Sequence, residues 1–103
     1  MAVFFMFGKY THESLRNITA RRTQDAVGVI EKLEGQVTAM YAMLGPYDLI
    51  MIVNLPGLPE AVEASIALSK LTGIGFMTCP ALSVDRFDHL IEIDLRKYMS
   101  SDK

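Results

Sequence analysis

The sequence has no tryptophan and only one cysteine, Cys79. A single cysteine cannot form a disulfide within the chain, so the sequence is not that of a small secreted domain held by disulfides. Long apolar runs are also missing. Residues 71–84 and 35–47 are the longest stretches without charge, shorter than the roughly 18 apolar residues of a membrane span. The first residues lack the basic segment of a signal peptide. We therefore expect a cytoplasmic protein with no membrane partner.

A basic excess is absent as well. Ten Lys and Arg residues stand against twelve Asp and Glu residues, which gives a formal net charge of −2. Proteins that bind nucleic acids usually carry a basic surface that contacts the phosphates. The only adjacent basic pairs, residues 21–22 and 96–97, have acidic residues close by. We expect no nucleic-acid partner.

Metal ligands are sparse too. His12 and His89 lie far apart, and neither has an acid or a cysteine at the spacing of a zinc site. Cys79 has no adjacent base that would activate it as a nucleophile. We therefore expect no metal and no cofactor.

The chain is expected to form one domain over residues 1–103. Half of its residues are hydrophobic, and no linker, low-complexity tract or internal repeat divides it. A domain of this size buries only about 60–65% of the surface of its unfolded chain. A partner surface would therefore add substantially to its stability.

Apolar runs and turn residues predict four strands and three helices. Strands are expected at residues 3–10, 36–44, 49–55 and 74–83, and helices at 19–33, 59–72 and 84–98. Residues 11–18 are expected to form a turn or a short helical entry. The expected helix-end residues are Thr19, Gly35, Pro59, Gly73 and Ser83.

This order is β-α-β-β-α-β with a C-terminal helix, the α+β pattern of the ferredoxin-like fold. We expect a four-stranded antiparallel sheet with strands 3–10 and 49–55 in the middle. Pro80 removes a hydrogen-bond donor from the last strand, which places that strand at an edge of the sheet.

Both faces of the two central strands are apolar. Val3, Phe5, Phe7, Ile50 and Ile52 lie on one side, and Phe4, Met6, Tyr10, Leu49, Met51 and Val53 lie on the other. A sheet with helices on one face normally alternates apolar and polar residues, because its other face is wet. The second face therefore needs a cover: a second copy of the chain, the C-terminal helix, or a bound apolar ligand. We expect a homo-oligomer packed face to face, an arrangement compatible with the helix lying partly across the partner.

The turn Gly45-Pro46-Tyr47-Asp48, followed by the apolar strand 49–53, resembles the signature of the GYD-domain family. Two further segments, Gly8-Lys9-Tyr10-Thr11 and Thr78-Cys79-Pro80-Ala81, agree with it, and the similarity extends over residues 3–90. The resemblance implies a dimeric α/β-barrel, in which two ferredoxin-like sheets pack face to face. That superfamily contains cofactor-free monooxygenases, isomerases, haem enzymes and small-molecule sensing domains, so the resemblance implies no particular reaction.

The candidate ligand-binding residues are Tyr47, Asp48, Tyr10 and Lys9. Asp48 suits a general base or a ligand anchor, but aspartate also accepts backbone hydrogen bonds in many turns. Tyr47 is equally typical of a strand residue with a wet hydroxyl. Lys9 and Tyr10 would form an anion pocket with Arg22 if the segment after the first strand folds over the sheet; surface solvation is the plainer alternative. Gly45 and Pro46 are expected to serve the turn itself.

The sequence thus predicts a homo-oligomeric small-molecule binding or assembly module, with a small apolar or aromatic ligand. The alternative is a cofactor-independent enzyme of the monooxygenase or isomerase kind, in which Tyr47 and Asp48 supply the polar groups.

Overall fold

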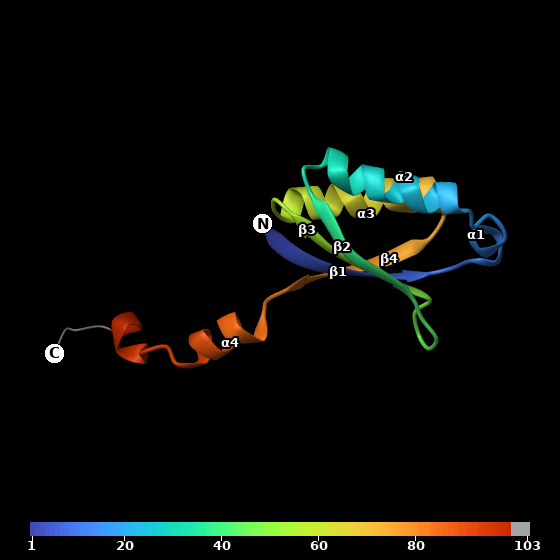
Figure 1. Cartoon of the computed structure of the whole chain (residues 1–103). Coiled ribbons are helices and arrows are strands. Elements are labelled where there is room, and N and C mark those ends of the chain that lie inside the picture. The colour runs from blue at the N-terminus through green and yellow to red at the C-terminus, as the bar shows by residue number, and fades with distance from the viewer. Residues whose placement is uncertain (100–103) are drawn as a thin grey trace.

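The computed structural model describes residues 1–99 as an antiparallel sheet with two helices on one face and a C-terminal arm (Figure 1). The strands are β1 (Ala2–Lys9), β2 (Gln36–Ala42), β3 (Leu49–Leu55) and β4 (Gly75–Ala81). The helices are α1 (His12–Arg16), α2 (Ala20–Lys32), α3 (Leu58–Thr72) and α4 (Val84–Ile91), followed by the 3-10 turn η1 (Leu95–Tyr98).

The strand order in the sheet is β2-β3-β1-β4, and every neighbouring pair is antiparallel. This confirms the ferredoxin-like prediction, with β1 and β3 in the centre. Strand β4 lies at an edge of the sheet, as predicted from Pro80, which has no backbone N–H to donate.

Side chains and one glycine define the helix ends, largely as predicted. The Thr19 hydroxyl accepts the Arg22 N–H at 3.0 Å and begins α2, and the Ser83 hydroxyl accepts the Arg86 N–H at 3.2 Å and begins α4. Gly73, with a φ of 73°, ends α3 in the left-handed conformation that glycine favours.

The end of α2 differs from the prediction. The left-handed residue there is Glu34, with a φ of 62°, and not Gly35. Gly35 is required for a different reason: a Cβ atom at this position would lie 2.5 Å from the carbonyl oxygen of Asn54 on β3. The glycine therefore allows the chain leaving α2 to approach β3 closely as it enters β2.

The core lies between the helices and the sheet. Its buried hydrophobic residues are Phe4, Met6, Ala26, Ile30, Met51, Val53, Leu55, Ala61, Ala64 and Leu68. At the end of α3 the buried residue is Thr72, whereas the apolar Leu71 is 41% exposed. Burial of Thr72 is tolerated because its hydroxyl donates to the Leu68 carbonyl and accepts the Ile74 N–H.

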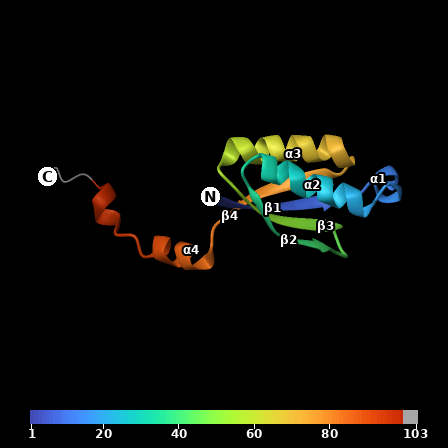
Figure 2. The same ribbon diagram turned by 45° about the horizontal axis from the view of Figure 1, so that its top comes forward.

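The opposite sheet face carries none of the helices in the described part of the chain (Figures 1 and 2). On this face, hereafter the open face, Phe5 lies between Ile52 of β3 and Cys79 of β4. The alternation along β1 confirms the two-sided pattern: Phe4 and Met6 are buried, whereas Val3, Phe5 and Phe7 are half-buried. The open face is therefore apolar at its centre.

The predicted continuous helix over residues 84–98 is wrong. Helix α4 ends at Ile91, and η1 starts after Asp94, whose carboxylate accepts the Arg96 N–H at 3.0 Å. Aspartate favours such a cap over a helix interior, which explains the interruption. The Arg96 side chain also bonds this carboxylate and holds the pKa of Asp94 below its usual value.

The arm formed by α4 and η1 points away from the rest of the chain in both views (Figures 1 and 2). Neither element has a buried residue. The C-terminal helix therefore does not cover its own sheet, which removes one of the three expected covers for the open face.

Candidate functional site

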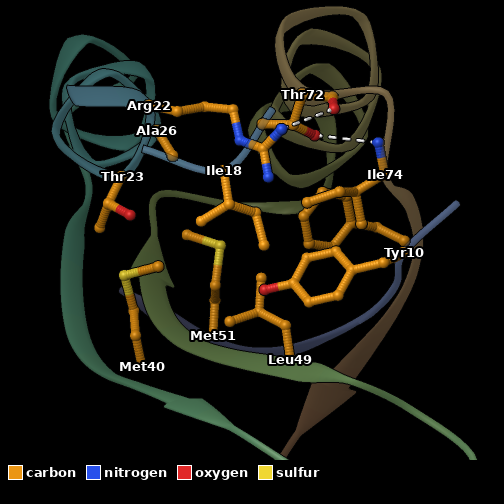
Figure 3. Close-up of a pocket in the computed structure, with 11 residues that line it drawn as sticks. Tyr10, Ile18, Arg22, Thr23, Ala26, Met40, Leu49, Met51, Thr72 and Ile74 are labelled. Carbon is orange, nitrogen blue, oxygen red and sulfur yellow. Dashed lines mark hydrogen bonds between the residues drawn. The ribbon is translucent and has the colours of Figure 1, made fainter. Parts of the chain in front are cut away.

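A cavity of about 60 Å³ lies between the helices and the sheet, beyond the end of β1 (Figure 3). It is lined by Tyr10, Ile18, Arg22, Thr23, Ala26, Met40, Leu49, Met51, Thr72, Ile74 and Phe76. Most of the lining is apolar, and a few polar groups converge on it. Small-molecule sites commonly have this composition.

Arg22 is fixed at the helical side of this cavity. The Thr19 cap sets the first turn of α2, from which the Arg22 side chain extends. Its Nη1 donates to the carbonyl oxygen of Ser14 at 2.9 Å and to that of Thr72 at 3.4 Å. The guanidinium thus connects α1, α2 and the end of α3, and it is held in one orientation beside the cavity (Figure 3).

Tyr10 contributes the second polar group. Its backbone N–H donates to the carboxylate of Asp48 at 2.9 Å, which fixes the chain just after β1. Figure 3 shows its ring beside Leu49, with the hydroxyl near Leu49 and Met51 and the Ile18 side chain drawn between it and the Arg22 guanidinium; both residues line the same cavity. The sequence left open an anion pocket formed by Lys9, Tyr10 and Arg22; Tyr10 and Arg22 line this cavity, whereas Lys9 does not.

Asp48 has a clear structural role. Its N–H donates to the Gly8 carbonyl at 2.9 Å, and its carbonyl accepts the Met43 N–H at 2.8 Å. Together with its bond to Tyr10, these contacts join the end of β1 to the β2–β3 hairpin. Asp48 also lines an open cleft of about 580 Å³ that His12 borders, so its carboxylate is within reach of a solute.

Two of the four sequence-predicted ligand residues lie elsewhere. The Tyr47 ring packs against Phe7 with centroids 5.3 Å apart, and its hydroxyl donates to the sulfur of Met77 at 3.3 Å. Because Phe7 and Met77 pair on the open face, Tyr47 lies at the end of that face, away from the cavity. The Lys9 ammonium donates to the Pro46 carbonyl at 3.2 Å and contacts the hairpin turn.

Gly45 adopts a φ of 116° in this turn. That conformation strains residues with a Cβ atom, so the geometry agrees with a structural role for the glycine.

The remaining reactive groups are dispersed. His89 lies on α4, where its Nδ1 contacts the carbonyl oxygen of Asp85, and Cys79 is a free thiol on the open face. Over residues 1–99, no three His, Cys, Asp or Glu side chains are grouped as a metal site would require. Within the same range, no helix combines the length and apolarity needed to cross a membrane.

The model of one family, the GYD domain, matches residues 4–91. This chain belongs to the GYD-domain family. The match includes the sheet except for the first two residues of β1, together with both covering helices and α4. It confirms the resemblance carried by the Gly45-Pro46-Tyr47-Asp48 turn.

The GYD domain is also similar in fold to the leucine response regulatory protein of Mycobacterium tuberculosis. That crystal structure superimposes with a TM-score of 0.54 at 13% identity, over 80% of this chain and 51% of the other. The chain thus spans about half the length of that protein, and the likeness concerns the fold alone. A comparison with curated proteins finds no match.

Proposed function

We propose that this GYD domain is a self-associating small-molecule-binding module, in which two copies pack their open faces together. The observation that carries the proposal is the apolar centre of the open face, which no segment of residues 1–99 covers. Phe5, Phe7, Ile50 and Ile52 form that centre on the two middle strands.

The cost of leaving this face wet supports a partner. Full burial of a large apolar side chain is worth about 1.5–3 kcal/mol, and the half-buried side chains of the open face would gain part of this. A small domain has a net stability of only about 5–15 kcal/mol, so covering several such side chains changes its stability considerably. A second copy supplies a matching apolar sheet through a two-fold interface.

The arm supports the same assembly. Its exposed large hydrophobic residues are Val84, Phe87, Leu90, Ile91, Ile93, Leu95 and Tyr98. The arm follows β4, an edge strand that borders the open face. An arm leaving this edge is well placed to lie against a copy packed on the open face, where its apolar residues would be buried.

The binding role follows from the cavity beneath α2, with its apolar walls and its Arg22 and Tyr10 groups. The enzymatic alternative has less support, because Tyr47 contacts the open face whereas Asp48 bonds to Tyr10 beside the cavity. We also infer a cytoplasmic location and no nucleic-acid partner from the single cysteine and the net charge of −2.

Native mass spectrometry of freshly purified protein tests the proposal. We expect the mass of two chains, or of a larger assembly built from pairs, with an added small mass where ligand is retained. Ile52→Lys places a charge in the centre of the open face and should leave a folded single chain. Ile66→Lys is the matched control, because Ile66 is 53% exposed on α3 and should not alter the mass of the assembly. A single-chain mass for the unmodified protein at tens of micromolar would contradict the proposal.

A further inference from the structure

We propose that the cavity beneath α2 binds a short-chain carboxylate, with the carboxylate on Arg22 and the alkyl tail among the apolar side chains. This inference rests on the proposed function and narrows its ligand. It departs from the apolar or aromatic ligand that the sequence suggested, for reasons of size and charge.

The size of the cavity limits the ligand. A water-sized group needs roughly 10–15 Å³ of such space, so a cavity of about 60 Å³ holds about four to six non-hydrogen atoms. Acetate, propionate and butyrate are of this size. Benzoate and larger aromatic acids exceed it.

The charge of the cavity favours an anion. Nη1 of Arg22 donates to two backbone carbonyls, and no carboxylate of residues 1–99 forms an ion pair with this guanidinium. Its Nε and Nη2 atoms donate to no protein acceptor in this range. The planar edge of a guanidinium binds a carboxylate through two parallel hydrogen bonds. Arg22 also lies in the first turn of α2, where the helix dipole attracts negative charge.

The Tyr10 hydroxyl complements the guanidinium. Tyr10 lines the same cavity, its hydroxyl lies beside Leu49 in Figure 3, and this hydroxyl has no hydrogen-bond partner among the described residues, so it can donate to an oxygen of a ligand that reaches it. The far walls are formed by Met40, Leu49, Met51 and Phe76, which offer no polar side-chain group other than thioether sulfur. These walls suit an alkyl tail and disfavour phosphate or sulfate, which are polar on every side.

The test is a titration of the full chain with small ligands. Isothermal calorimetry measures the affinity, and amide chemical shifts in NMR locate the binding site. The probes are propionate, its neutral isostere propionamide, and inorganic phosphate. We expect saturable propionate binding with a dissociation constant on the order of 1 mM, as befits so small a ligand. Propionamide and phosphate should each bind at least about tenfold more weakly. The largest shift changes should occur near Arg22 and Tyr10.

Two variants assign the binding to these groups. Arg22→Gln should weaken propionate binding by at least about tenfold and leave propionamide unchanged, whereas Arg21→Gln, on the exposed neighbour, should change neither. Since Arg22 also holds two backbone carbonyls, its variant must be checked for folding by circular dichroism. Tyr10→Phe removes only a hydroxyl and should weaken propionate binding by about three- to tenfold even if Arg22→Gln does not fold.

The outcomes separate this inference from the proposed function. Equal binding of propionate and propionamide would overturn the carboxylate assignment and leave a small-molecule module in place. Equal binding of phosphate and propionate would overturn the alkyl-tail assignment. No binding of propionate would overturn the inference outright, while the mass of the assembly tests self-association independently.

Discussion

The carboxylate of Asp48 accepts the backbone N–H of Tyr10 at 2.9 Å, across 38 positions of sequence. This contact joins the β2–β3 hairpin to the end of β1 and so sets where the Tyr10 ring enters the cavity. The residue that the sequence offered as a general base thus holds the backbone of the residue that contacts the cavity.

We expect Asp48→Ala to lower the free energy of unfolding by about 1.5–3 kcal/mol, because it removes an ionised acceptor from a half-buried N–H. Asp48→Asn retains an acceptor oxygen and should cost less. Urea denaturation measures both changes. Asp25→Ala, at an exposed position of α2, is the control and should stay within about 0.5 kcal/mol of the unmodified protein. Equal effects of the two alanine substitutions would contradict the structural role of Asp48.

Two glycines near α2 should respond to alanine in opposite directions. A Cβ atom at Gly28 would meet nothing within 4 Å, so Gly28→Ala should stabilise the helix by about 0.5–1 kcal/mol. At Gly35 the same atom would meet the Asn54 carbonyl at 2.5 Å, so Gly35→Ala should destabilise the protein by about 1–3 kcal/mol. Urea denaturation of both variants provides the comparison. A neutral Gly35→Ala would mean that β2 and β3 approach less closely than the structure indicates.

Local patterns were sufficient to predict the ferredoxin-like order, the central strands and the caps at Thr19 and Ser83. Each of these depends on neighbouring residues: alternation in a strand, or a hydroxyl before a helix. The run of apolar residues on β1 also predicted correctly that the strand has apolar side chains on both faces of the sheet.

The cavity was harder to predict because its lining comes from segments far apart in the chain. Tyr10 and Arg22 were among the candidates, but Ile18, Thr72 and Ile74 carry no local sign of a site and meet only in the fold. The end of the C-terminal helix was missed for a different reason. Its apolar spacing continues to Tyr98, but the Asp94 cap overrides that spacing.

Cys79 provides a chemical probe of the open face, because it pairs with Phe5 at the centre of that face. If two copies pack there, iodoacetamide should alkylate this thiol at least about tenfold more slowly in the assembly than in the Ile52→Lys variant, because a buried thiol is inaccessible. Mass spectrometry over time gives both rates, and protein unfolded in urea gives the reference rate. Equal rates in the two folded proteins would place the interface elsewhere.

The arm should contribute to assembly and not to the stability of the domain. No residue of α4 or η1 is buried, so a chain ending at Leu82 should keep its unfolding midpoint under conditions where both proteins are monomeric. The dissociation constant of the assembly should be at least about tenfold higher for the shortened chain, because burying even one large apolar side chain contributes about 1.5–3 kcal/mol. Analytical ultracentrifugation measures this change.

A matched pair of double variants distinguishes the two faces of α4. Phe87→Ser with Ile91→Ser removes apolar side chains that are 53% and 64% exposed, and should reproduce the weaker association of the shortened chain. Asp85→Asn with Asp88→Asn alters the polar face of the same helix and should leave association nearly unchanged. If the serine variant associates as tightly as the unmodified protein, the arm does not pack on the second copy, and the interface is confined to the open face.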